Sequence, residues 1–207
     1  MSTTSAYGWN IPDNTDLVKD GALAIRTLGN AIDTSMNTAL GTKKAGIVLL
    51  NTTTFSAVSS QSISDVFSTT YDNYRILLYS TPTSNIGYGF NLRVSGADNT
   101  TANYRYGSHY VDGASGAGVR YSQVNATKAD LCQAFADPVC ISLDIYNPFN
   151  SSLKTTWTGS YFMHRTASTF FETGYTGGSF NATTSFTGFT ISGGTQTGTI
   201  SVYGYSK

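Results

Sequence analysis

The sequence has few charged residues. Lys and Arg number 12, Asp and Glu number 12, and together they make up 12% of the 207 residues, with a formal net charge of zero. An average soluble domain carries about twice that charged fraction, so Ser, Thr, Asn and Gly must keep the surface hydrated. This neutrality argues against nucleic acid binding, since the twelve cations are scattered and Lys43–Lys44 is the only adjacent basic pair. Such a surface is common on extracellular or particle-borne β proteins.

Long apolar runs are also absent. The longest one, Gly46–Leu50, is far too short to span a bilayer. Residues 1–10 have neither the basic n-region nor the apolar h-region of a secretory signal. We therefore expect the protein to be made in a cytoplasm and to stay there, unless a larger particle carries it out.

Cysteine is scarce as well. Cys132 and Cys140 stand on either side of Asp137–Pro138. They could bridge a hairpin, but two cysteines do not form a disulfide scaffold, and cytoplasmic synthesis favours buried free thiols. No metal-binding motif includes them, so we expect neither a metal ion nor another cofactor.

Catalytic residue types are few. The sequence has two histidines, His109 and His164, one glutamate, Glu172, and no His-Glu-x-x-His or Gly-x-Ser-x-Gly motif. Glycoside cleavage needs two facing carboxylates, and Glu172 has no obvious partner. The segment Gly113–Gly118 superficially resembles a nucleotide-binding loop, but no helix is predicted after it, so it is interpreted as a hairpin loop. The sequence predicts that the protein is not an enzyme.

One sustained helical pattern is present, from Asp13 to Leu40. Asp13 or Asn14 can cap its start. Apolar or small residues recur in it at alternating spacings of three and four, as in the seam of a coiled coil. The predicted seam consists of Val18, Gly21, Ile25, Leu28, Ile32, Ser35 and Ala39. A single helix of this length is marginal in water, so the stripe must be buried. It packs either on the β domain of its own chain or, the interpretation that we favour, on copies of itself.

After the helix, β-branched and aromatic residues dominate, with Gly, Asn, Asp and Pro between them. The pairs Gly177–Gly178 and Gly193–Gly194 are predicted turns, and Ala126–Phe135 is either a helical turn or a loop. We expect strands near Gly46–Ala57, Ser62–Val66, Asn73–Ser80, Tyr88–Val94, Tyr104–Val111, Val119–Asn125, Pro138–Tyr146, Lys154–His164, Thr169–Tyr175, Ser185–Ser192 and Gly198–Tyr205. So many strands without intervening helices predict an antiparallel β-sandwich or jelly roll. Residues 46–207 then form a β head, and residues 1–45 form an N-terminal strap and helix.

The segment Ala102–Tyr121 has the character of a binding surface. Three tyrosines would share one face of a strand there, with an arginine and a histidine on the other face. Tyrosine offers flat apolar area with a polar tip, which suits saccharide or protein surfaces. In the alternative, the tyrosines face the core, and the arginine and histidine are solvated. The candidate receptor-binding residues are Tyr104, Arg105, Tyr106, His109, Tyr110 and Arg120.

Tyr7, Trp9 and Ile11 alternate in a polar N-terminal segment. An exposed aromatic tail would be a liability if it were left free. We therefore expect an extended strap that packs against another protein, with these three residues as its anchor.

The N-terminal segment also resembles a known family. Residues 7–21 read YGWNIPDNTDLVKDG, and residues 24–33 read AIRTLGNAID. This run resembles the N-terminal segment of tailed-bacteriophage structural proteins described as minor tail or fibre-like proteins. More loosely, residues 68–76, STTYDNYRI, and residues 198–205, GTISVYGY, are similar to the β domains attached to that segment.

The resemblance implies a virion protein, usually a homotrimer, whose N-terminus is fixed to other virion proteins and whose β domain faces outward. It implies assembly in the host cytoplasm, release by lysis and no membrane insertion. The seam has Val18, Ile25 and Ile32 at position a and Leu28 at position d. On pattern alone, these residues favour a coiled coil of two helices, whereas the family is trimeric. Two functions stay open. One is a short fibre that carries the β head to a host-surface saccharide or protein. The other is a head fibre or capsid decoration protein with a structural role only.

Overall fold

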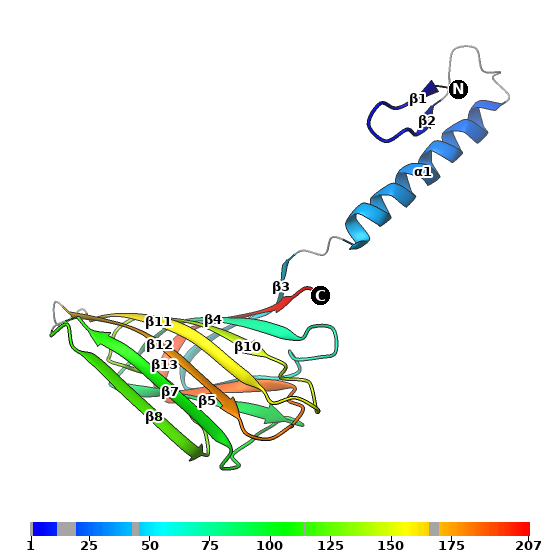
Figure 1. Ribbon diagram of the computed structural model, residues 1–207. Helices are drawn as coiled ribbons and strands as arrows, with labels where there is room; N and C mark the ends of the chain where they lie inside the picture. Colours follow the sequence, from blue (N-terminus) through cyan, green and yellow to red (C-terminus); the bar gives the residue numbers. More distant parts are fainter. Residues whose placement is uncertain (1, 12–19, 43–45, 114, 166–169) are drawn as a thin grey trace. The chain divides into compact units, whose positions relative to one another are not determined.

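The computed structural model describes residues 2–11, 20–42, 46–113, 115–165 and 170–207 (Figure 1). The chain divides into two compact units, Met1–Ala45 and Gly46–Lys207, and each is described by itself. In the described part of the chain, no helix combines the length and the apolarity that crossing a membrane would need.

The N-terminal unit consists of a short hairpin and one helix. Strands β1 (Ser2–Thr3) and β2 (Asn10–Ile11) pair antiparallel. Gly8 closes the hairpin with a φ of 66°, a left-handed conformation that glycine adopts without strain. Helix α1 spans Gly21–Thr42. The predicted earlier start of this helix, from Asp13 to Val18, lies outside the described residues.

The second unit consists almost entirely of antiparallel strands. They are β3 (Ile47–Ile63), β4 (Asn73–Pro82), β5 (Ile86–Val94), β6 (Ala97–Asp98), β7 (Tyr104–Asp112), β8 (Gly118–Ala126), β9 (Ala129–Ala134), β10 (Val139–Tyr146), β11 (Thr156–Arg165), β12 (Phe170–Phe180) and β13 (Gly188–Tyr205). They form one curled sheet in the order β6-β5-β13-β4-β10-β11-β12-β7-β8, with β3 added to β13 and β9 added to β5 (Figure 1). The prediction of a mainly β, antiparallel fold is confirmed.

Strand β13 connects the two halves of the curled sheet. It pairs with β3 along most of its length. On its other edge, residues 188–192 pair with β5 and residues 196–204 pair with β4. A register shift between Ser192 and Gln196 marks the place where that neighbour changes. Strands β4, β10, β11, β12, β7 and β8 thus form one layer, which we call the six-stranded layer, and β3, β13, β5 and β9 form the other half.

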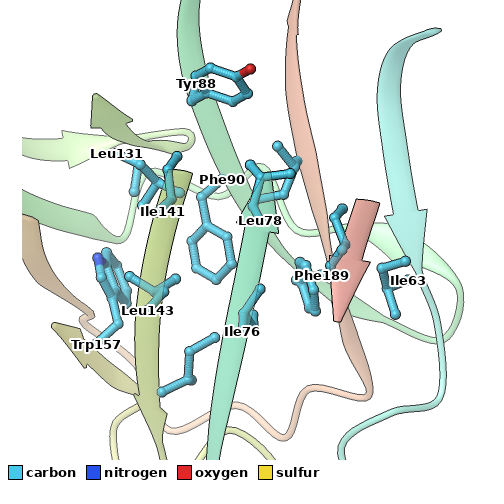
Figure 2. Close-up of a cluster of buried hydrophobic side chains, with 14 of the residues drawn as sticks. Ile63, Ile76, Leu78, Tyr88, Phe90, Leu131, Ile141, Leu143, Trp157 and Phe189 are labelled. Atoms are coloured by element: carbon cyan, nitrogen blue, oxygen red, sulfur yellow. The ribbon is translucent and has the colours of Figure 1, made fainter. Parts of the chain in front are cut away.

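The core lies between the two halves of the sheet. Phe90 of β5 meets Trp157 of β11 edge-on, with ring centroids 5.6 Å apart, and it lies 6.0 Å from Phe189 of β13 (Figure 2). Side chains alternate between the two faces of β11, where Trp157, Tyr161 and Met163 are buried. Full burial of a large apolar side chain stabilises a fold by about 1.5–3 kcal/mol, so this cluster supplies much of the driving force.

An ion pair ties three strands together on the outer face. Arg75 of β4 donates from Nε and Nη2 to the two carboxylate oxygens of Asp144 on β10, at 2.8 and 2.7 Å. The Tyr205 hydroxyl of β13 donates to Asp144 Oδ1 at 2.6 Å. Partial burial acts to raise the pKa of Asp144, but the hydrogen bonds from Arg75 and Tyr205 outweigh it and hold that pKa below the ordinary value of 3.8.

The predictions for three glycine-rich or unassigned segments were wrong. Residues 129–134 form strand β9, which pairs with β5, and not a helical turn or a loop. Gly177–Gly178 lies inside β12 and Gly193–Gly194 lies inside β13, so neither pair forms a turn. A Cβ on Gly178 would lie 2.4 Å from Trp157 Cζ2, and one on Gly194 would lie 2.5 Å from Ile86 Cγ2. These two glycines therefore serve close packing within strands.

Both cysteines are free thiols. Cys132 on β9 is buried, and burial raises the pKa of its thiol. Cys140 on β10 is exposed, so the prediction that both thiols are buried was wrong for this residue. The reason is the alternation of β10, which directs Ile141 inward and its neighbour Cys140 outward.

Candidate functional site

The structure separates the candidate receptor-binding residues onto the two faces of the paired strands β7 and β8. Tyr104 and Tyr106 are buried, and Tyr110 is half-buried against the same core. The Tyr104 hydroxyl donates to the Asn99 carbonyl at 2.8 Å, and the Tyr106 hydroxyl donates to Asp130 Oδ2 at 2.8 Å. Burial raises the pKa of Tyr104 to about 12. The prediction that Tyr104 and Tyr106 contact a receptor was therefore wrong, because both are core residues.

The other three candidates stay on the outer face. Arg105 and His109 of β7 are exposed, as their alternation with the tyrosines predicts. Arg120 of β8 is also exposed, and it is the registered partner of His109. The structure therefore brings His109 and Arg120 together, with Arg105 farther along the same strand.

Side chains on the outer face of the six-stranded layer lie in rows that follow the strand register. One row runs from Thr158 on β11 through Gly177 on β12 and Gly107 on β7 to Ser122 on β8. Two adjacent strands carry no side chain in this row, so a hollow forms there. We call it the glycine trough, and its volume is about 540 Å³. Residues that line it include Gly107, His109, Arg120, Ser122, Thr158, Tyr175 and Gly177.

Two walls border the glycine trough along the strand direction. On one side, Tyr175 of β12 pairs with His109, which pairs in turn with Arg120. On the other side, Arg105 of β7 pairs with Ser179 of β12. Each of these residues lies two positions from the floor glycine of its own strand. Among the described residues that line the trough, none is a carboxylate. The two arginines therefore give this polar surface a local positive charge, although the chain as a whole is neutral.

Tyr175 was not singled out by its sequence pattern. Its side chain is 71% exposed, and it lines both the glycine trough and a second hollow on the same layer. That second hollow is more apolar, and its lining includes Leu77, Tyr79 and Phe162. Strand β12 was predicted to end at Tyr175, and only the continuation to Phe180 shows that Tyr175 and Gly177 share the outer face.

The predicted anchor residues form a cluster within the N-terminal unit. The Tyr7 ring stacks on Trp9, with centroids 5.0 Å apart, and the Trp9 indole N–H donates to Ser35 Oγ of α1 at 3.0 Å. Trp9 and Ile11 are half-buried, while Tyr7 is exposed. The expectation of an extended strap was therefore wrong, because this segment folds into a hairpin whose Trp9 is tied to the helix.

Helix α1 carries an exposed apolar stripe beside that hairpin contact. Ala24 is buried, and Leu28 and Ser35 are half-buried on the flank that faces Trp9. On the adjoining flank, Ile25 is 65% exposed and Met36 is 52% exposed. The seam residues Gly21, Ile32 and Ala39 follow the same stripe at helical spacing. Val18, the first residue of the predicted seam, lies outside the described residues.

Comparisons with known proteins identify no family. No family of known proteins and no curated protein matches the chain. Among solved structures, the lectin UEA-II complexed with galactose is 8% identical and has a TM-score of 0.20, over 76% of this chain and 88% of that one. The VP2 subviral particle of infectious bursal disease virus is 8% identical, with a TM-score of 0.15, over 77% of this chain and 41% of that one. Likenesses this weak carry no argument about fold or function.

The arrangement is suited to binding. Within the described ranges, no group of three or more His, Cys, Asp or Glu side chains is placed to hold a metal ion. The glycine trough instead combines a bare floor, hydroxyl groups, the exposed rings of Tyr175 and Tyr121, and Arg120, with Arg105 beyond the lining on the opposite side of the floor. Those are groups that hold a polar ligand in place.

Proposed function

We propose that the protein is a virion structural protein of a tailed bacteriophage, a trimeric short fibre that carries a β head to the host surface. The resemblance of residues 7–33 to the phage segment supports the setting. The observation that carries the proposal is the exposed apolar stripe of α1, in a unit separate from an antiparallel head. A helix that precedes a head and leaves isoleucine in water is suited to assembly with its own copies.

The stripe favours self-association for an energetic reason. Ile25 is 65% exposed in the single chain, so burying it in a helical seam would contribute about 1–2 kcal/mol per chain. The hairpin covers one flank of the helix through Trp9 and Ser35 and leaves the flank of Ile25 uncovered. Three helices that meet along this narrow stripe would bury it and keep the hairpins outside. Trimerisation along α1 also places three heads on one stalk, so that weak contacts act together.

Light scattering of the purified full-length chain tests the stalk. We expect the full-length chain to have three times the mass of one 22.1 kDa chain. Residues 46–207, which contain the whole β core, should be monomeric. A monomeric full-length chain would overturn the trimer.

Immunogold electron microscopy of the phage particles tests the setting. Antibodies against residues 46–207 should label the tail and should block adsorption to the host. Label on the capsid shell, with adsorption intact, would replace the attachment role by that of a head fibre or decoration protein. Particles without label would overturn the virion assignment.

A further inference from the structure

The floor of the glycine trough is not required by packing. A Cβ on Gly107 would lie 3.4 Å from the Tyr121 carbonyl oxygen, an ordinary contact. A Cβ on Gly177 would lie 3.3 Å from the Trp157 carbonyl oxygen, which a shift of a few tenths of an ångström relieves. Neither glycine has a positive φ. Glycine within a strand destabilises it by roughly 0.5–1 kcal/mol relative to alanine, and here neither a positive φ nor a Cβ contact under 3.0 Å calls for glycine. The effect of the two glycines is to keep the floor bare.

The wall above that floor presents an aromatic face to water. Tyr175 is 71% exposed at the middle of a sheet, where neighbouring strands usually shield a ring. A rigid, exposed tyrosine provides flat apolar area with little loss of conformational entropy on binding. The flat apolar face of a pyranose ring fits such a platform. The hydroxyl groups of Thr158 and Ser122, at the two ends of the floor, can exchange hydrogen bonds with sugar hydroxyls.

The charges around the trough select the kind of sugar. Arg120 stands in the wall with Tyr175, and Arg105 stands on the opposite side of the floor. A guanidinium group pairs with a carboxylate or phosphate through two parallel hydrogen bonds. No carboxylate lines this hollow among the residues described, so no lining residue competes with an anionic ligand for Arg120. The volume of about 540 Å³ lies within the range of small-ligand sites and is enough for one or two sugar units.

We propose that the glycine trough binds a sugar unit that carries a negative charge, a uronic or other acidic sugar or a sugar phosphate. The sugar ring stacks on Tyr175, its hydroxyls meet Thr158 and Ser122, and its anionic group pairs with Arg120 or Arg105. This site rests on the proposed attachment function for its biological role, and it places the contact on the sheet face and not in the loop between β7 and β8.

The test measures binding of the full-length chain to sensor surfaces by interferometry. The surfaces carry glucuronate, galacturonate, N-acetylneuraminate, glucose 6-phosphate, neutral glucose or a phosphate group on a plain linker. A single open site of this size should bind in the millimolar range, so densely coated surfaces are needed. We expect binding to at least one acidic sugar, at least about tenfold above neutral glucose and above the plain phosphate.

Four variants locate the site. Gly107→Val fills the floor at a position that accepts a Cβ, Tyr175→Ser removes the platform, and Arg120→Gln removes the charge. Each should lower binding to the acidic sugar by about tenfold or more while the melting temperature stays close to that of the wild type. Tyr79→Ser is the matched control, since Tyr79 is 60% exposed on the same layer but lies outside the trough. It should bind as the wild type does.

Several results would overturn the proposal. They are equal binding to neutral glucose, equal binding to the plain phosphate, no binding to any acidic sugar, or undiminished binding by a folded Gly107→Val. If no acidic sugar binds but the trimer is still found on the tail, the sugar site is refuted and the attachment function is not. Sugar binding by a chain that is absent from virions leaves the site standing and refutes the attachment function.

Discussion

Two neighbouring glycines of β12 should respond in opposite ways to the same substitution. Gly178 points into the core, where an added Cβ would lie 2.4 Å from both the Arg105 carbonyl oxygen and Trp157 Cζ2. Gly177 points outward, and its nearest neighbour would be the Trp157 carbonyl oxygen at 3.3 Å. We predict that Gly178→Ala destabilises the β head and that Gly177→Ala does not.

The magnitude follows from two effects. Replacing glycine by alanine restricts the unfolded chain and stabilises a protein by about 0.4–1 kcal/mol where the backbone tolerates it. This gain is common to both variants, so it cancels in their difference. Overpacking a filled core costs about 1–3 kcal/mol, and at Gly178 one of the three clashing atoms is backbone of the paired strand β7. Gly178→Ala should therefore be less stable than Gly177→Ala by about 1–3 kcal/mol.

Urea unfolding of the full-length chain measures this difference. The chain has two tryptophans, and Trp157 is buried beside Gly178. A Trp9→Phe background in every protein compared therefore leaves Trp157 as the only tryptophan reporter of the β head. We expect a lower midpoint for Gly178→Ala and an equal or higher one for Gly177→Ala, relative to that background. Equal midpoints for the two variants would refute the reasoning, because the inward and outward positions would then be equivalent.

Three further predictions concern the stalk, the ion pair and the thiols. Ile25→Asp should dissociate the trimer, because a carboxylate would be buried in the seam. Leu23→Asp, at a position 63% exposed on the other side of the helix, should leave the trimer intact. Light scattering measures both masses, and a trimeric Ile25→Asp would contradict the seam. The lowered pKa of Asp144 means that its ionised form stabilises the fold above the ordinary value of 3.8 and that this stabilisation is lost as pH falls through the folded-state pKa. Asp144→Asn should therefore cost about 1–2 kcal/mol at pH 7, and its urea midpoint should approach that of the wild type in acid; a constant difference refutes this. Iodoacetamide should modify exposed Cys140 in the folded protein and buried Cys132 only after unfolding, as mass spectrometry of the peptides would show; equal labelling contradicts the burial.

The parts of the fold that sequence predicts well are those with a local period. The alternation of Trp157, Tyr161 and Met163 with Thr158, Ser160 and Phe162 identifies the strand β11 and sorts its side chains onto two faces, because side chains of a strand alternate between faces. The same reasoning separates Tyr104 and Tyr106 from Arg105 on β7. It does not say which face is covered, and the choice of the tyrosine face as a binding surface was wrong for that reason.

The parts that sequence predicts poorly depend on residues far away in the chain. A glycine pair has the same local signal whether it forms a turn or admits a neighbouring side chain, and only the position of Trp157 decides the matter for Gly178. Strand β3 was likewise divided in two around Ala57, which takes a φ of 53° inside a continuous strand. Strand β9 was missed because its pairing with β5 is what makes it a strand.

The glycine trough belongs to this second class. Gly107 and Gly177 are distant in sequence and become neighbours only through the register of β7 and β12. A site on a sheet face has a physical advantage over a site on a loop, since ladder hydrogen bonds fix its floor and walls before a ligand arrives. Binding there orders few new groups, so more of the contact energy remains as affinity.

The glycines of β12 also make it possible to separate function from stability by experiment. At the two that point inward, Gly174 and Gly178, an added Cβ would lie 2.7 and 2.4 Å from its nearest neighbours, so substituting them damages the core. Gly177, which points outward, has no contact that close, and neither has Gly107 beside it on β7. A substitution at an outward glycine that abolishes binding to acidic sugars therefore acts on the site itself, provided that the urea midpoint is unchanged. An inward substitution that weakens binding only in proportion to unfolding acts through the fold. The two series together distinguish a ligand-binding surface from a surface whose glycines have no binding role. Only in a ligand-binding surface does a side chain that the fold tolerates abolish binding when it fills the trough.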